Sequence, residues 1–208
     1  MRRDLLIAAQ KEFLRMYPGG FENEEMQVHV KKHKIAKMHD FAIESFAEDK
    51  FNDADKIFDN LVKMITRSSV VSVFEKAKFR DFAKTMTTDQ KLRLVNGLYE
   101  RLHGNPAAGF NMMRDVLLED KLAKWPILTI IPYYYNLQNE VFMKPTTVKG
   151  VIRTFELEGV VYSSRASYEI YEAYKKEFLK MKEIVEPSVA PENGAFSGFL
   201  MMMVEADK

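Results

Sequence analysis

Apolar residues recur at helical spacing along most of this 208-residue chain, and that periodicity limits the folds open to it. Between residues 88 and 104, for example, Leu92, Val95, Leu98 and Leu102 stand three or four positions apart. A helix with such a stripe must bury it against other elements. The pattern therefore predicts a mainly α-helical single domain, a bundle or array of about eight to ten helices.

Start and stop signals define the expected ends of these helices. Thr87 with Gln90 three positions later matches a capping box, and Asn105 before Pro106 is typical of an N-cap followed by the first helical residue. Pro18 and the glycines after it end the first helix. The predicted helices cover residues 2–16, 24–48, 53–67, 73–84, 88–104, 106–122, 145–159 and 167–185.

One segment, from Lys124 to Thr147, departs from this pattern. It holds the only tryptophan, three of the seven prolines and a run of three tyrosines, residues 133–135. Proline removes a backbone donor and breaks helices. Bulky apolar residues interrupted by proline therefore predict a buried, irregular or extended segment, which we expect to run through or against the core.

The C-terminal region divides into a turn-rich stretch and an apolar tail. We expect residues 1–186 to form the helical domain and residues 187–208 to form a linker and an apolar segment that docks on the same domain. The tail from Phe199 to Val204 predicts either a short buried strand or a docked helix.

Charge and composition restrict the function. Lysine and arginine number 31 against 30 aspartates and glutamates, which argues against a surface that coats nucleic acid broadly but allows a local basic patch. The absence of cysteine excludes disulfides, thiolate nucleophiles and cysteine metal sites. Without a stretch of ~20 apolar residues or a signal-peptide core, we expect a soluble, cytoplasmic protein with no membrane partner.

Sequence motifs for catalysis are missing. The chain has no Gly-x-Ser-x-Gly elbow, no phosphate-binding Gly-x-x-x-x-Gly-Lys loop and no Gly-x-Gly-x-x-Gly turn. We therefore expect no cofactor and lean against an enzyme, although an enzyme of unknown class stays an alternative.

Glu25, His29 and His33 are the one weak candidate for a metal site. They stand four positions apart and share a helix face, which suits one carboxylate and two imidazole ligands. A zinc motif of the His-Glu-x-x-His type would place glutamate where Val30 stands, and the flanking lysines disfavour a cation. We expect no metal and an ordinary solvated face.

The strongest candidate site is the helix start at residues 144–153. Lys144, Thr146, Thr147, Lys149 and Arg153 combine two hydroxyls with three cations where free N–H groups favour an anion. This arrangement predicts an anion or nucleic-acid site. The alternative is that a threonine merely caps the helix and the lysines are solvated.

Aromatic residues near this helix bear on the same hypothesis. The tyrosines at 133–135, and Tyr162 if it returns nearby, would stack on bases. The short helix followed by Val160–Tyr162 also hints at half of a winged helix-turn-helix, although Pro126 and Pro132 disfavour the helix that should precede it.

Several short blocks occur in a set order along the chain: Tyr17–Phe21 (YPGGF), Phe74–Lys76 (FEK), Gly97–Tyr99 (GLY), Lys124–Thr129 (KWPxxT), Phe142–Pro145 (FMKP), and Tyr162 with Tyr168 and Tyr171. In this order they resemble a family of uncharacterised prokaryotic proteins. Relatives carry a tryptophan near the C-terminus that this chain lacks. The resemblance implies no activity, since none is known for the family, but it implies one unit from end to end.

Three functions stay open on these grounds. We expect first a binding or interaction protein without catalytic activity, whose partner is another protein or a phosphate-bearing ligand. The alternatives are a module that binds nucleic acid or phosphate through residues 144–153, and an enzyme of unknown class.

Overall fold

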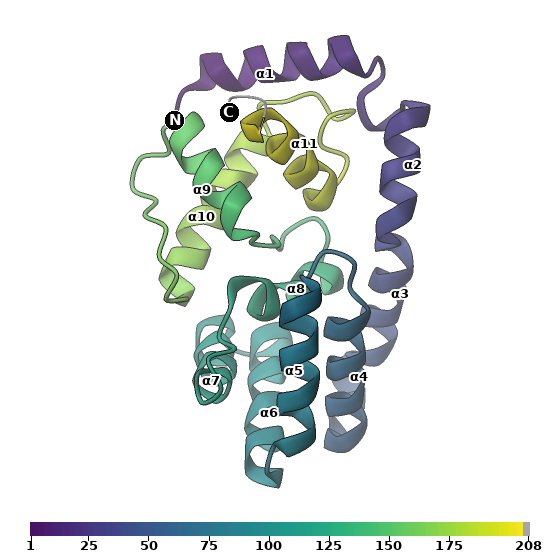
Figure 1. The fold of residues 1–208 in the computed structure, drawn as a ribbon, viewed down its shortest axis with the longest axis vertical. Helices are drawn as coiled ribbons and strands as arrows, with labels where there is room; N and C mark the ends of the chain where they lie inside the picture. Colours follow the sequence, from purple (N-terminus) through teal and green to yellow (C-terminus); the bar gives the residue numbers. More distant parts are fainter. Residues whose placement is uncertain (206–208) are drawn as a thin grey trace.

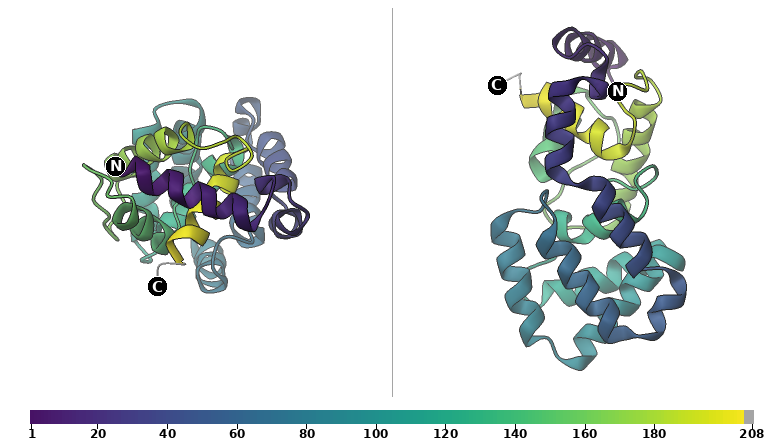
Figure 2. Two further views of the ribbon diagram at one scale, coloured as in Figure 1. Left: turned by 90° about the horizontal axis from the view of Figure 1, so that it is seen from above. Right: turned by 90° about the vertical axis from the view of Figure 1, so that its right-hand side faces the viewer.

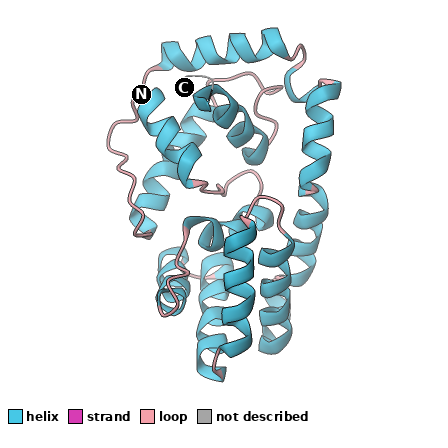
Figure 3. Ribbon diagram, viewed as in Figure 1, coloured by secondary structure: helices cyan, strands magenta, loops and turns pink. Residues whose placement is uncertain are grey.

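The computed structural model describes residues 1–205, and in that range every regular element is a helix (Figure 3). The mainly α-helical fold predicted from the sequence is therefore confirmed. The helices are α1 (Arg3–Met16), α2 (Glu24–His33), α3 (Ile35–Ser45), α4 (Ala54–Arg67), α5 (Val73–Thr85), α6 (Thr88–His103), α7 (Pro106–Leu118), α8 (Trp125–Tyr135), α9 (Pro145–Thr154), α10 (Tyr168–Lys182) and α11 (Asn193–Glu205), with short 3-10 helices η1 (Gly20–Glu22) and η2 (Glu48–Asn52).

The helices form an elongated molecule with two ends (Figures 1 and 2). At one end α4 to α7 lie side by side, with α8 above them; at the other end α1 crosses over α9, α10 and α11. Helices α2 and α3 run along one side and connect the two ends. Within residues 1–205, no helix is long and apolar enough to span a bilayer.

Helix α8 is the centre of the core, and it corrects one prediction. The segment after Lys124 is buried as expected, but residues 125–135 form a regular helix rather than an irregular or extended piece. Pro126 lies in the first turn, where a missing N–H is tolerated. Pro132 lies inside the helix, and contacts with α3, α4, α6 and α7 stabilise the helix around it.

Helices α2 and α3 correct a second prediction, that one long helix spans residues 24–48. Lys34 adopts a left-handed conformation with φ of 51°, so α2 ends at His33 and α3 begins at Ile35. Helix α3 packs on α8 and α4, whereas α2 buries only Met26. The change in packing partners at Lys34 accounts for the break, because neither glycine nor proline stands there.

The C-terminal tail is a docked helix, the second of the two predicted possibilities. Helix α11 packs on α9 and α1, and Phe199 and Leu200 are fully buried. The last part of the predicted 187–208 segment, residues 206–208, lies outside the described residues. Residues 160–162, expected to be extended, form no strand, so the wing of a winged helix is not present there.

Helices α6 and α7 form an antiparallel pair in which glycine permits unusually close contact. A Cβ atom built on Gly109 would lie 2.2 Å from the backbone nitrogen of Arg101 and 2.5 Å from the carbonyl oxygen of Gly97. No real Cβ sits so close to backbone atoms, so any larger residue at position 109 must push the helices apart. The position of Arg101 on α6 therefore depends on Gly109.

Replacing Gly109 with alanine tests this close contact. We expect Gly109→Ala to lower the free energy of unfolding by about 1–3 kcal/mol, because the added methyl group overpacks the α6–α7 contact. Urea unfolding followed by circular dichroism measures the change. Gly198→Ala is the matched control: Gly198 is also helical, and its added Cβ would meet only Phe21 Cζ, at 3.8 Å. The control should be neutral or stabilising, and equal losses in both variants would contradict the prediction.

Candidate functional site

Helix α9 presents most of the residues that the sequence singled out on one exposed face. Thr146, Lys149 and Arg153 are separated by three and four positions, and all three are exposed. Lys144 is exposed at the N-cap, where no side chain caps the helix. The helix begins here because Pro145 takes the first helical position. The structure thus brings Thr146, Lys149 and Arg153 to one exposed face, with Lys144 exposed at the start of the helix.

Thr147, the fifth predicted residue, lies on the opposite face. Its side chain is only 4% exposed, and its Oγ1 atom makes no hydrogen bond within the described residues. Val148 and Val151, which are also buried, share this inner side of α9, and Gly150 allows α11 to approach through Val204. Thr147 therefore belongs to the packing between helices and not to the exposed surface.

Two of the exposed cations, Lys149 and Lys144, have neighbouring side chains within contact distance. The Nζ atom of Lys149 lies 4.9 Å from the ring centroid of Tyr162, within the range of a cation–π contact. The Nζ atom of Lys144 lies 3.3 Å from Sδ of Met201. Neither lysine, nor Arg153, forms an ion pair inside residues 1–205. We call Lys144, Thr146, Lys149, Arg153 and Tyr162 the α9 surface.

The tyrosines that were expected to stack on bases separate into two groups. Tyr133 and Tyr134 are core residues; the hydroxyl of Tyr133 donates to Glu192, and that of Tyr134 lies 2.9 Å from Ser68 Oγ. Burial raises the pKa of Tyr133 well above its usual range. Tyr135 and Tyr162 are only partly buried. The Tyr135 ring packs against His103, at 5.5 Å between ring centroids, whereas Tyr162 lies beside Lys149.

The weak metal candidate stays spread along α2. Glu25, His29 and His33 are all exposed, and His33 Nδ1 lies 3.0 Å from Ser69 Oγ in the loop before α5. Across the described chain, no group of three or more histidine, aspartate or glutamate side chains is arranged to hold a metal ion.

A buried charge cluster that sequence reasoning missed joins the two ends of the molecule. The carboxylate of Glu140, in the loop after α8, accepts hydrogen bonds from Arg101 on α6 and from the Tyr171 hydroxyl on α10, the latter at 2.6 Å. Lys175 on α10 adds an ion pair at 3.3 Å. The side chains of Arg101 and Glu140 are 3% and 14% exposed. We call these four residues the Glu140 cluster.

The electrostatics of this cluster favour one arrangement of charge. Burial alone would raise the pKa of Glu140, but the charges of Arg101 and Lys175, with the hydrogen bonds from Tyr171 and Arg101, outweigh it and the pKa lies below its usual value. Burial and the nearby carboxylate raise the pKa of Tyr171 well above its usual range, so its hydroxyl stays a donor. The acid and base groups thus bind one another inside the protein.

Asn193, at the start of α11, holds the same loop from the other side. Its Nδ2 atom donates to the carbonyl oxygens of Gln138 and Glu140, at 3.0 and 2.9 Å, and its Oδ1 atom accepts from Lys182 at 2.9 Å. Residues 101, 140, 171 and 193 are far apart in sequence, so no local pattern predicts their contact. The one available signal was a mostly polar loop, residues 136–140, after an apolar helix.

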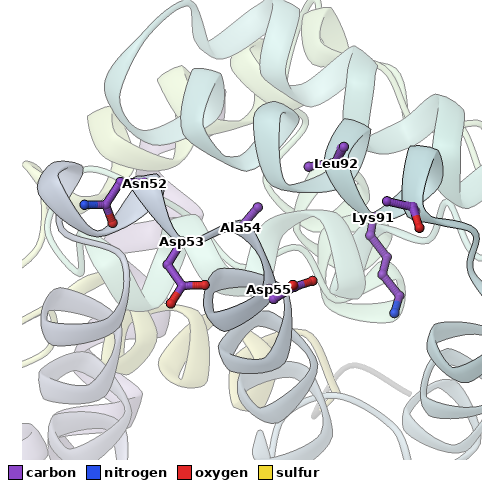
Figure 4. Close-up of a pocket in the computed structure, with 7 residues that line it drawn as sticks. Asn52, Asp53, Ala54, Asp55, Lys91 and Leu92 are labelled. Carbon is purple, nitrogen blue, oxygen red and sulfur yellow. The ribbon is translucent and has the colours of Figure 1, made fainter.

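An open cleft of about 560 Å³ lies where η2 and α4 meet the start of α6 (Figure 4). Asp53 already caps α4 by accepting from the backbone N–H of Lys56, and the ammonium of Lys91 lies 5.1 Å from the ring centroid of Phe58. Figure 4 shows Asp53 and Lys91 on different walls, with their charged ends apart. This cleft has no set of side chains that converge on one point.

Comparison of the chain with protein-family models, with curated proteins and with solved structures gives no match. The resemblance to an uncharacterised prokaryotic family therefore stays a prediction, and the argument for function rests on the surfaces described above.

Removing the buried carboxylate of Glu140 should strongly destabilise the folded protein. We expect Glu140→Ala to lower the free energy of unfolding by about 3–5 kcal/mol, because it leaves Arg101 buried without its partner. Urea unfolding measures this loss. Glu119→Ala is the control, since Glu119 pairs with Arg93 at 3.3 Å on the surface, where such pairs contribute under about 1 kcal/mol. A similar loss in both variants would show that the Glu140 cluster contributes no more than a surface pair.

Proposed function

We propose that this protein is a binding protein without catalytic activity, and that it binds single-stranded nucleic acid on the α9 surface. The observation that carries the proposal is the exposed row of Thr146, Lys149 and Arg153, whose two cations have no carboxylate partner in the described residues. Tyr162 lies beside them.

The chemistry of this surface suits a phosphate backbone with bases beside it. Lysine and arginine contact phosphates and release counterions, and an aromatic ring offers a stacking platform that tolerates any base. The N-terminal end of α9 adds positive potential next to Lys144. A surface with three cations supports weak binding that depends on salt, in keeping with the near-zero net charge of the chain.

The location of the acid and base groups supports a binding role over catalysis. The buried carboxylate and phenol with shifted pKa values, Glu140 and Tyr171, lie inside the protein and are bound to each other and to Arg101. An active site of the usual kind places such groups in a cleft that a substrate reaches.

A fluorescently labelled oligonucleotide tests the proposal directly. We expect binding at about 50 mM salt, measured by fluorescence anisotropy, that weakens as salt increases. The double variant Lys149→Glu/Arg153→Glu should weaken binding at least about tenfold, because two attractive contacts become repulsive. Its melting temperature should stay near that of the wild type, since both side chains are exposed.

Lys11→Glu/Lys78→Glu is the matched control for charge. Both lysines are exposed, on α1 and α5, and the double variant changes the net charge by the same amount. Oligonucleotide binding by the control should stay close to that of the wild type. Equal weakening in the two double variants, or no binding by the wild-type protein at low salt, would refute a site on the α9 surface.

A second candidate, a protein-interaction role, is favoured by one apolar pair. Val73 and Phe74, at the start of α5, are 74% and 83% exposed. Two adjacent apolar side chains this exposed are unusual outside contact surfaces, although the pair is smaller than a typical interaction patch.

A photo-crosslinking residue at position 74 tests this second candidate. If Phe74 faces a protein partner, the probe should yield one discrete crosslinked product in cells, and Val73→Ser should reduce its yield by removing the neighbouring apolar contact. The same probe at Leu118, which is 51% exposed on α7, is the control. Identical products from both positions would indicate non-specific capture.

A further inference from the structure

The N-terminal arm, residues 1–33, is joined to the rest of the chain at a single residue. It comprises α1, η1 and α2; the ring of Phe21 in η1 packs on Phe13 of α1, and α2 packs on η1. Lys34 alone separates α2 from α3. Figures 1 and 2 show α1 crossing over α9, α10 and α11, and α2 running along one side to α3. The arm can therefore turn as one unit if the backbone changes at Lys34.

Lys34 holds a strained conformation that the surrounding sequence does not require. Its φ of 51° is in the left-handed region, which is unfavourable for any residue with a Cβ atom. Lys121 and Glu156 also have positive φ, but both lie in turns. Residues 22–48 contain neither glycine nor proline, so the local sequence favours one continuous helix. A helix running without a break from Glu24 to Ser45 would release the strain.

Few contacts hold α2 in its bent position. Met26 is the one residue that α2 buries. Within residues 1–205, its side-chain hydrogen bonds to the helices beyond Lys34 join His33 and Ser69, with 3.0 Å between Nδ1 and Oγ, and both residues are exposed. Exposed polar contacts of this kind contribute little net stability, because water replaces them. Little free energy therefore opposes the release of α2.

The other half of the arm has a buried face that must stay covered. Leu6 and Phe13 on α1 are fully buried, and the ring centroid of Phe13 lies 5.2 Å from that of Phe199 on α11. A polar contact fixes the same arrangement, since the backbone N–H of Glu186 donates to Oε1 of Gln10 at 2.7 Å. If the arm turns away, α1 needs an identical receptor, and a second copy of the chain supplies one.

We propose that this protein forms a domain-swapped dimer, in which the arm of each chain docks on α11 and the segment after α10 of the other chain. Lys34 then becomes helical, and α2 and α3 join into one helix of about 33 Å. The contacts of α1 form again between the two chains, so the exchange buries the same apolar surface. Short hinges under strain favour such exchange. Because association costs translational freedom, the dimer requires high protein concentration.

Refolding at two protein concentrations, followed by size-exclusion chromatography with light scattering, tests the proposal. We expect wild-type protein refolded from urea at about 200 µM to contain a dimer, and protein refolded at about 1 µM to be monomeric. Lys31, Lys32 and Lys37 lie near the hinge and are exposed. Salt at about 0.3 M screens these lysines from those of the second chain.

Replacing Lys34 with glycine isolates the contribution of the hinge. Lys34→Gly should raise the dissociation constant of the dimer at least about tenfold, because glycine adopts the left-handed conformation without strain and weakens the continuous helix. Its melting temperature as a monomer should be unchanged or higher. Lys32→Gly is the matched control, since Lys32 is exposed and helical whether or not the arm is exchanged. The control should keep the dissociation constant near that of the wild type.

A crosslink between chains distinguishes a swapped dimer from any other dimer. The chain has no cysteine, so Gln10→Cys in one tagged chain and Glu186→Cys in a second provide the only thiols. After the two chains are refolded together at high concentration, a short bismaleimide should join them, because position 10 of one lies beside position 186 of the other. The double variant Gln10→Cys/Glu186→Cys, refolded at low concentration, should crosslink within one chain and controls for reach.

The outcomes decide the proposal in either direction. A dimer that is depleted in Lys34→Gly, kept in Lys32→Gly and crosslinked between different chains supports it. Wild-type protein that stays monomeric at about 200 µM, a dimer equally abundant in the two glycine variants, or a dimer without the product between chains would overturn it. Oligonucleotide binding through Lys149 and Arg153 is measured separately, so failure of one proposal leaves the other standing.

Discussion

The burial of α8 is the constraint on which the rest of the structure depends. Ten of its eleven residues are buried, so it has no polar face to turn toward water. A helix of this kind is stable only when other helices surround it. Helices α3, α4, α6 and α7 do so, and polar contacts occupy its few polar groups: His39 Nδ1 lies 2.7 Å from the Tyr134 carbonyl oxygen, and Trp125 Nε1 donates to Ser163.

The loop after α8 is held in place by hydrogen bonds to α8 and to helices at the other end of the molecule. The Thr129 hydroxyl accepts from the backbone N–H of Met143, and the Tyr171 hydroxyl accepts from that of Val141. Glu140 binds α6 and α10 in the same stretch. The loop before α9 is therefore held by α8 at Met143 and by α10 at Val141. Such support orients the α9 surface, and a binding site on rigid elements is more precise than one on a mobile loop.

Local chemistry was predictable from the sequence, and contacts between distant residues were not. The capping box at Thr87 and Gln90 and the cap at Asn105 are confirmed, because a cap depends on a few neighbouring residues. The exposed row of Thr146, Lys149 and Arg153 on α9 could be predicted for the same reason, because it depends only on the spacing of neighbouring residues. The inward direction of Thr147, the break at Lys34 and the helical state around Pro132 depend on which helices pack nearby. Local propensity is weaker than such packing.

The Glu140 cluster joins the two ends of the molecule through buried charged groups, at a position where apolar side chains could also pack. Removing a buried ion pair from water costs several kcal/mol per ion, and well-packed apolar residues are often as stable. Apolar contacts, however, tolerate sliding, whereas Glu140 has one position in which Arg101, Tyr171 and Lys175 all reach its carboxylate. Removing one partner is nevertheless costly, because it leaves the opposite charge buried without compensation. Because α10 supplies two of these partners and packs beside α7, a shift of α10 would break them together. The loop after α8 thus joins α6 to α10 through the polar contacts of Glu140.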